Sequence, residues 1–248
     1  MKWRLMDFER RTASVNMAID EAVSIAVGRG ESPPTIRFYG WEPSAVSIGC
    51  FQSVQEEVDV EVCREIGLDI VRRRTGAGAV YHDRNGEITY SVICPLDMVE
   101  NDISASYCTI CGWIIDALDL LGLQGQFHPI NDVLVRGRKI SGSAQTRRGG
   151  VLLMHGTLLY DLDPGTMFSV LKVGKEKLSD KDIMEFDERV TCILNEIEVP
   201  WHLVLRALRV AFTCEKDWEM GTLSKNEMVQ VHKLAVERYG SDEWTYSR

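Results

Sequence analysis

The feature that most constrains the fold is the segment spanning residues 132–163. It reads DVLVRGRKISGSAQTRRGGVLLMHGTLLYDLD. Within it, runs of apolar and β-branched residues are separated by two turns that contain glycine, which predicts three strands joined by hairpins. Hairpin-linked strands run antiparallel, so this part of the chain predicts an antiparallel sheet.

Helical patterns surround this segment. Residues 14–30 predict a helix that begins after a Ser14 cap and ends at Gly28 or Gly30, and residues 104–122 predict another. The chain from Pro164 onward is mainly helical in pattern. Two β-rich runs, PTIRFYGW and AVSIGCFQ, predict adjacent strands, and VQEEVDVEVCREIG predicts one short amphipathic helix. Because strands and helices do not alternate regularly, we expect an α/β fold of the α+β type, with a mixed, largely antiparallel sheet flanked by helices.

Composition excludes several classes of protein. The net charge of −9 argues against a nucleic-acid binder, and no run of about 18 uncharged apolar residues exists to span a membrane. The N-terminus, MKWRLMDFERR, is too charged for a signal peptide. Seven scattered cysteines predict free thiols and a cytoplasmic protein, with Cys108 and Cys111 packing on a helix as small apolar residues.

Positive charge gathers beside glycine in RRRTGAGAVYHD, residues 72–83. Small residues allow an anion or a flat ring to approach backbone N–H groups, and arginine side chains at the end of a strand can form paired hydrogen bonds with phosphate or carboxylate oxygens. The spacing matches neither a P-loop nor a dinucleotide fingerprint. From these residues alone, a nucleotide loop and a simple tight hairpin both remain open.

A second candidate group lies in GRKISGSAQ, residues 137–145. If Lys139 points inward from its strand it needs an anionic partner, whereas a lysine on a surface hairpin needs none. His82 and His155 are either structural or functional histidines. Asn131 and Asp132 either cap a turn or offer oxygen ligands to a magnesium ion.

In chain order, several blocks resemble those of the lipoate–protein ligase family: NMAIDEA, RFYGWEPSAVSIGCFQ, RRRTGAGAVYHD, NDVLVRGRKISGSAQTRRGGVLLMHGTLLYDLD and DEWTY. The family shares its fold with biotin–protein ligases and the cores of class II aminoacyl-tRNA synthetases. By this resemblance Lys139 is the catalytic residue. The ATP and lipoyl-AMP site is then expected at Arg73, Gly76, Gly78, Ala79, Val80, Tyr81, Asn131, Asp132 and Lys139. Asp132 is the candidate magnesium ligand, and the acyl chain and carrier lysine are expected near His82, Ser141, Gly142 and His155.

The resemblance implies an ATP-dependent enzyme that activates lipoic acid with ATP and Mg²⁺ to lipoyl-AMP. The lipoyl group then passes to a lysine of a lipoyl domain. Expected carriers are the lipoyl domains of 2-oxoacid dehydrogenase acyltransferase subunits and the glycine-cleavage carrier protein, with no nucleic-acid or membrane partner. The chain is expected to form one catalytic domain over residues 1–248 without the small C-terminal domain of many bacterial ligases, which a separate accessory polypeptide can supply.

The alternative is an octanoyltransferase or lipoyl amidotransferase of the same superfamily, which uses a cysteine thioester and no ATP. Where that branch is expected to carry its cysteine, this chain reads GQFHPIND. Cys50 is the nearest substitute by motif and is expected to line the pocket. A further departure is Ala77, which stands in the middle of the family's usual three glycines and carries a Cβ that disfavours a glycine-like φ.

Overall fold

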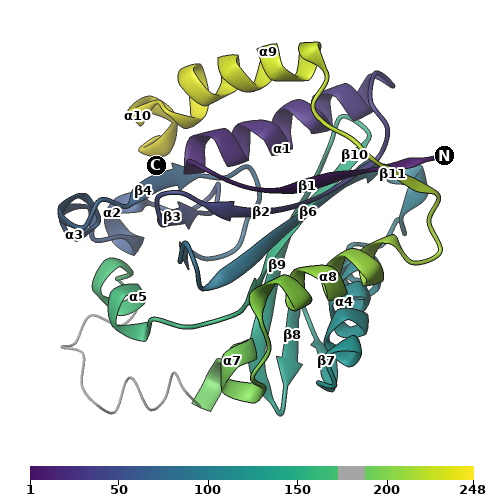
Figure 1. Cartoon of the computed structure of the whole chain (residues 1–248). Coiled ribbons are helices and arrows are strands. Elements are labelled where there is room, and N and C mark those ends of the chain that lie inside the picture. The colour runs from purple at the N-terminus through teal and green to yellow at the C-terminus, as the bar shows by residue number, and fades with distance from the viewer. Residues whose placement is uncertain (173–187) are drawn as a thin grey trace.

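The computed structural model describes residues 1–172 and 188–248. A large sheet runs through the molecule in the order β11-β1-β2-β6-β10-β9-β8-β7 (Figure 1). Strand β1 is parallel to β2 and β11, and the other neighbours are antiparallel. The predicted mixed, largely antiparallel sheet is therefore confirmed. Its strands are β1 (Trp3–Arg11), β2 (Thr35–Trp41), β6 (Glu87–Pro95), β7 (Gly125–His128), β8 (Asp132–Val135), β9 (Arg138–Arg148), β10 (Val151–Leu159) and β11 (Trp218–Met220).

The three strands predicted from residues 132–163 form as β8, β9 and β10. Both connecting turns have positive φ at their two central residues, 51° and 77° at Arg136 and Gly137 and 59° and 74° at Gly149 and Gly150. Two-residue hairpins with this backbone match the right-handed twist of the flanking strands. Strands β1 and β11 were not predicted, because β1 carries charged residues along its second half and β11 is short and exposed.

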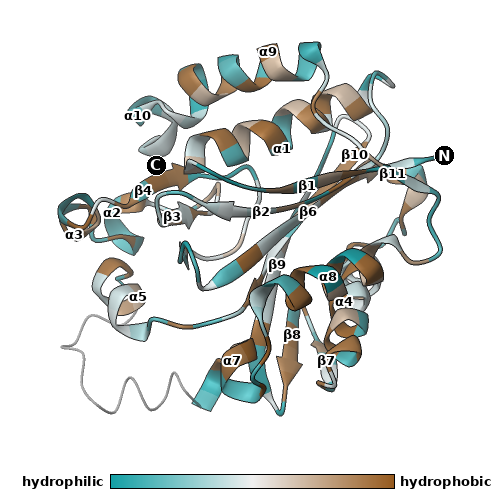
Figure 2. Cartoon of the chain, viewed as in Figure 1, coloured by the Kyte–Doolittle hydropathy of each residue, from teal (hydrophilic) through white to brown (hydrophobic). Residues whose placement is uncertain are grey.

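Helices cover both faces of the large sheet (Figure 1). On one face, α1 (Ala13–Gly28) and α9 (Lys225–Leu234) pack together, and hydrophilic and hydrophobic positions alternate along α9 (Figure 2). On the other, α4 (Ile103–Leu120) packs against α8 (Trp201–Thr213) and buries Ile110 with the sheet residues. The hydrophobic core therefore has two parts, one on each side of the sheet.

Helix α4 is long and apolar enough to pass as a membrane-crossing helix by length and composition alone. Core helices pass the same test, and α4 packs Ile114 and Leu118 into the core. Cys111 is also buried there as predicted, but Cys108 is exposed. The first predicted helix begins two residues earlier than expected, because the Thr12 hydroxyl, not Ser14, accepts a hydrogen bond from the backbone N–H of Val15.

A second, three-stranded sheet has the order β4-β3-β5, with β3 (Ala45–Ile48), β4 (Asp69–Arg72) and β5 (Val80–His82). The prediction that the runs forming β2 and β3 are adjacent strands is wrong. Both edges of β2 are occupied by β1 and β6, so β3 pairs with β4 and β5 instead. This small sheet packs a third apolar cluster against its own helices.

The single helix predicted after β3 is two, α2 (Val54–Glu57) and α3 (Val60–Glu65). Val58 is extended and bridges to Leu171, and the Asp59 side chain caps α3. The other elements in the described residues are η1 (Leu96–Met98), α5 (Pro164–Val170), α7 (Ile193–Glu196), the π-helical turn η2 (Ala235–Tyr239) and α10 (Asp242–Thr245).

Candidate active site

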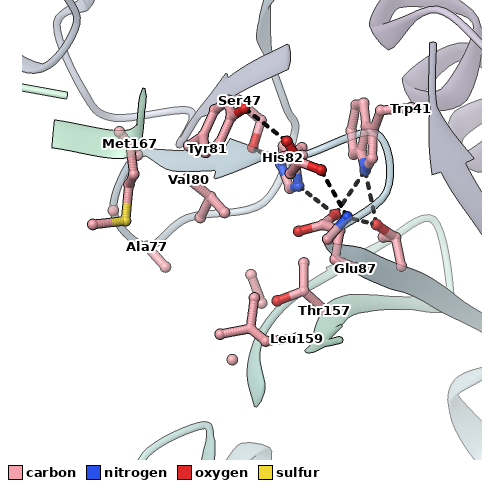
Figure 3. A pocket seen from close by; sticks show the side chains of 18 of the residues that line it. Trp41, Ser47, Ala77, Val80, Tyr81, His82, Glu87, Thr157, Leu159 and Met167 are labelled. Atoms are coloured by element: carbon pink, nitrogen blue, oxygen red, sulfur yellow. Dashed lines mark hydrogen bonds and ion pairs between the residues drawn. The ribbon is translucent and has the colours of Figure 1, made fainter. Parts of the chain in front are cut away.

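A cavity of about 310 Å³ lies where the two sheets meet. The large sheet contributes residues of β2, β6, β9 and β10, and the small sheet contributes β3, β5 and the glycine-containing turn before β5. Figure 3 shows Val80, Leu159 and Met167 at one part of this cavity and a polar group of Ser47 and His82 at another. An apolar chamber with a few placed polar groups is the usual form of a small-molecule site.

The first arginine of the run, Arg72, fastens the C-terminal segment to the small sheet. Its guanidinium donates to the carbonyls of Gly49 at 3.0 Å, Gln52 at 2.7 Å and Trp244 at 3.1 Å. It also donates twice to the Thr245 carbonyl, at 3.1 and 2.8 Å. Only 1% of Arg72 is exposed. All these acceptors are backbone carbonyl oxygens of the protein itself. Arg72 is therefore a structural clamp that anchors the DEWTY block.

Arg73 lines the cavity and organises the glycine-containing turn. Its Nε donates to Thr75 Oγ1 at 3.1 Å, and its two terminal nitrogens donate to the Ser47 carbonyl and hydroxyl and to the carbonyls of Gly76 and Gly78. The paired hydrogen bonds expected with a ligand are thus made with oxygens of the chain. Burial lowers the pKa of Arg73 to about 10, so the side chain is still charged at neutral pH.

The turn that Arg73 holds contains Ala77 in a left-handed conformation, with φ at 69°. This left-handed conformation costs an L-residue roughly 1–2 kcal/mol of conformational energy. The Ala77 carbonyl lies against Gly49, where an added Cβ would stand only 2.2 Å from the oxygen. The alanine therefore adopts a backbone conformation that glycine takes without steric cost, and Gly49 makes room for the turn.

Lys139 also lines the cavity, from β9. Its Nζ lies 2.7 Å from Asp132 Oδ1 in an ion pair, outside the angles of a hydrogen bond. The side chain passes over Gly142, where an added Cβ would stand 2.8 Å from both Cε and Nζ. A bulge in the pairing of β8 with β9 places Lys139 and Gly142 on the same side of the strand. The Lys139 side chain is 41% exposed at the cavity, and Asp132 is its anionic partner.

Asp132, predicted as the magnesium ligand, is engaged by Lys139. Among the described residues, no group of three His, Cys, Asp or Glu side chains stands close enough to hold a metal ion. Asn131 lines the cavity and donates from its side chain to the Ser143 carbonyl, while its own carbonyl accepts from the Ser143 N–H at 3.0 Å. This pair fixes the end of β8 beside Lys139.

The two candidate histidines each lie between a carboxylate and a hydroxyl. His82 Nδ1 is 2.7 Å from Glu87 Oε1, and its Nε2 is 2.8 Å from Ser47 Oγ. The His82 ring stacks on Trp41 with centroids 4.0 Å apart. Figure 3 shows this group together at the wall of the cavity. The imidazole is therefore held by contacts on both nitrogens and on one face.

His155 occupies a similar position deeper in the protein. Its Nδ1 is 3.2 Å from Asp20 Oδ2 and its Nε2 is 2.7 Å from Thr75 Oγ1. Asp20 also pairs with the buried Arg37 at 2.8 Å. Burial lowers the pKa of His155 below its ordinary value, against the opposing effect of Asp20.

All seven cysteines lie in the described part of the chain, and none of them lines the cavity. The expectation that Cys50 is a pocket residue is wrong: it follows β3, half-buried, with its N–H donating to the Thr75 carbonyl at 2.9 Å. Cys111 Sγ is 3.7 Å from Ser143 Oγ, behind the wall, and burial raises its pKa to about 12.

The structure brings most of the predicted site residues to one cavity. Those in its wall are Arg73, Gly78, Ala79, Val80, Tyr81, His82, Asn131, Lys139, Gly142 and His155. Of the described residues predicted for the site, Gly76, Asp132 and Ser141 are not in the wall. The β9 bulge turns Ser141 away, and its buried hydroxyl has no hydrogen-bond partner among the described residues.

Sequence reasoning missed Ser47, Trp41 and Glu87. The one signal for Glu87 is a carboxylate at the start of an otherwise apolar strand.

Comparison with known proteins identifies the family. The model of the lipoyl protein ligase A/B catalytic domain matches residues 12–213. The chain belongs to this family. Octanoyltransferase LipM of Kyrpidia tusciae is 36% identical to it over 99% of both chains, and that of Geobacillus kaustophilus is 35% identical over 99% of this chain and 98% of its own. Among solved structures, a bi-partite lipoate protein ligase of Thermoplasma acidophilum, described with its E2 lipoyl domain, matches with a TM-score of 0.89, 31% identity and coverage of 99% and 96%.

These findings confirm the resemblance and the predicted fold of this lipoyl protein ligase A/B family member, and they correct its predicted reaction. The ATP-dependent lipoate ligase is wrong as the main prediction, because several curated relatives that match the chain from end to end are octanoyltransferases LipM. The protein is an enzyme of the lipoate and biotin ligase superfamily, a lipoyl or octanoyl transferase that acts in protein lipoylation. The single-domain organisation and the accessory polypeptide stay predictions.

Proposed function

We propose that this protein is an ATP-independent octanoyltransferase. It takes an octanoyl group from a carrier to which the group is bound as a thioester and transfers it to a lysine of a lipoyl domain. The observation that carries the proposal is the end-to-end similarity to octanoyltransferases LipM. Attack on a thioester creates negative charge on its carbonyl oxygen, and fixed cationic or N–H groups stabilise that charge.

The cavity supports this chemistry. Its volume of about 310 Å³ falls at the lower end of small-molecule sites, and its apolar wall suits a saturated chain. Lys139 and Arg73 are both in the wall, so positive charge lies next to the chamber that would hold the acyl chain. A thioester placed between them would have its carbonyl oxygen near an ammonium group and its chain among apolar side chains.

The arginine contacts also support a reaction without ATP. The N–H groups of Arg72 and Arg73 are directed to oxygens of the chain. Phosphate oxygens would have to displace those bonds to reach either guanidinium. The cationic groups therefore fit a role in shaping the cavity and its potential better than a role in holding a triphosphate.

The acceptor of the proposed reaction is a lipoyl domain, and the Thermoplasma relative is described together with one. We extend this to the lipoyl domains of 2-oxoacid dehydrogenase acyltransferase subunits and to the glycine-cleavage carrier protein. Donor and acceptor are both proteins that carry the group on a flexible arm, and we place the reaction in the cytoplasm.

The test uses octanoyl-loaded carrier protein and an unmodified lipoyl domain, with EDTA present and nucleotide absent. Intact-mass spectrometry should show the lipoyl domain gaining one octanoyl group, and replacement of its target lysine by arginine should abolish the gain. A parallel reaction contains free octanoate or lipoate with Mg-ATP in place of the loaded carrier. Modification in that reaction alone would overturn the proposal.

Gly142→Ala is predicted to lower octanoyl transfer at least about 10-fold, because the new Cβ would collide with Lys139 Cε and Nζ at 2.8 Å and push the ammonium from its place. A flexible side chain can move aside, so the fold should persist. Transfer rates measured beside a thermal unfolding curve check both expectations. Gly112→Ala is the matched control, since nothing lies within 4 Å of the added Cβ on α4.

A further inference from the structure

Transfer of an acyl group through an enzyme-bound intermediate needs a nucleophile at the cavity. The cysteine thioester expected for this branch has no candidate there, because all seven cysteines are described and none is in the wall. The wall does hold a hydroxyl group, that of Ser47, hydrogen-bonded to the imidazole of His82. The following inference rests on the proposed octanoyl transfer and concerns the group that accepts the acyl chain.

We propose that Ser47 is the acyl-accepting nucleophile, with His82 as its general base and Glu87 as the group that orients His82. Ser47 Oγ is 2.8 Å from His82 Nε2, and His82 Nδ1 is 2.7 Å from Glu87 Oε1. All three side chains line the cavity. A hydroxyl, an imidazole and a carboxylate joined in this order form the arrangement that activates serine nucleophiles on many unrelated folds.

The neighbouring groups fix the direction of these hydrogen bonds. Glu87 can only accept as a carboxylate, so His82 donates to it from Nδ1 and leaves Nε2 as an acceptor. Arg73 donates to Ser47 Oγ at 3.1 Å and cannot accept. The Ser47 proton is therefore directed at His82 Nε2. This is the direction that base catalysis requires, and the adjacent guanidinium stabilises negative charge on the attacking oxygen.

Glu87 is placed to orient His82. Glu87 is 2% exposed, and Oε1 accepts from the Trp41 indole at 2.9 Å and the Thr89 hydroxyl at 2.7 Å. Oε2 has no hydrogen-bond partner in the described part of the chain. The only ion pair that Glu87 forms among those residues is with His82. A buried carboxylate without another cation partner stabilises the imidazolium that forms when Ser47 gives up its proton.

The second carboxylate, imidazole and hydroxyl group does not meet these conditions. Thr75 and Ser47 are both buried, but only Ser47 is in the cavity wall, so an acyl group in the cavity does not reach the Thr75 hydroxyl. Asp20 is already paired with Arg37 at 2.8 Å. The Asp20, His155 and Thr75 group therefore supports Arg73 from behind, whereas Ser47 faces the chamber.

The proposed reaction has two balanced steps. Ser47 Oγ attacks the thioester carbonyl and passes its proton to His82; the C–S bond breaks, the leaving sulfur takes that proton, and an octanoyl ester of Ser47 remains. The neutral amine of the lipoyl-domain lysine then attacks the ester. An amide forms, the C–O bond breaks, and a proton returns to Ser47 Oγ through His82. The sum converts thioester and amine into amide and thiol, with no further reactant.

The experiment is to trap the acyl-enzyme with octanoyl-loaded carrier and no acceptor, locate the octanoyl group by peptide mass spectrometry and treat the complex with neutral hydroxylamine. Neutral hydroxylamine cleaves thioesters readily and oxygen esters slowly. We expect a resistant adduct on the peptide containing Ser47. Ser47→Ala should remove the adduct and lower transfer at least about 100-fold. Ser47→Cys should carry a hydroxylamine-sensitive adduct, whereas Cys50→Ala should behave as wild type.

Several outcomes would overturn the assignment. They are an adduct on a cysteine of the wild-type enzyme, a wild-type rate in Ser47→Ala, or no adduct in either wild type or Ser47→Cys. None of these outcomes contradicts the proposed octanoyltransferase activity if the wild-type enzyme still transfers octanoyl groups without ATP. Absence of any transfer by the wild-type enzyme instead contradicts the proposed function itself. The two proposals therefore fail in distinguishable ways.

Discussion

Lys139→Met is expected to lower the rate of octanoyl transfer by roughly 100- to 1,000-fold, the loss typical when one group that stabilises a developing oxyanion is removed. The ammonium lies at the cavity and methionine keeps much of the side-chain volume without its charge. Asp132 loses its partner, but its side chain is 26% exposed and water can solvate it. We therefore expect the fold to remain, and the assay is ATP-independent transfer to a lipoyl domain.

The control for this variant is Lys233→Met on α9, whose side chain is 62% exposed and pairs only loosely with Glu237 at 3.9 Å. It removes one positive charge far from the cavity and should leave the transfer rate unchanged. If Lys139→Met retained the wild-type rate at saturating and limiting substrate, the ammonium would have no part in the reaction. A loss equal in both variants would point to net charge and not to a local role.

Local patterns were sufficient to predict the three hairpin-linked strands β8, β9 and β10. The segment over residues 132–163 shows its turns through paired residues such as Gly149 and Gly150, and a hairpin links strands that are neighbours in sequence. The pairing of β3 could not be predicted in the same way. It depends on which edges of β2 remain open, and β1 and β6, which are distant in sequence, decide that.

Part of the candidate site was also predictable from local patterns in the sequence. Arg73 and Lys139 were singled out by charge beside glycine, and both are in the cavity wall. The partners of Arg73 were not predictable, since its acceptors come from β3 and from the turn that it holds. Ser47 carries no local signal, because an isolated serine in an apolar strand becomes distinctive only once His82 lies beside it.

The sequence motifs predicted acyl chemistry but not the reaction, for a physical reason. The blocks that identify this family build the cavity and its positive potential, which both an adenylating ligase and a transferase require. They therefore indicate acyl chemistry without indicating how the acyl group is activated. The residues that separate the two reactions are individual nucleophiles and ligands, and their roles depend on contacts such as the ion pair between Lys139 and Asp132.

The largest effect on stability is expected for Arg72→Met, which should lower the free energy of unfolding by about 3–5 kcal/mol. Methionine preserves volume but leaves the carbonyls of Gly49, Gln52 and Thr245 without their charged donor. Hydrogen bonds to charged groups each contribute roughly 1.5–3 kcal/mol, and buried acceptors left unpaired cost more than exposed ones. Urea unfolding followed by tryptophan fluorescence and by circular dichroism measures the change.

Arg84→Met separates this clamp from a general effect of arginine loss. The Arg84 side chain is 54% exposed and pairs with Glu42, whose side chain is 44% exposed, so its removal should change stability by no more than about 0.5 kcal/mol. Because Arg72 also binds the carbonyl of Trp244, loss of the clamp should release α10 and change the environment of that indole. A destabilisation by Arg72→Met no larger than that of Arg84→Met would show that other contacts hold the C-terminal segment on the small sheet, and that the buried guanidinium contributes little to the fold.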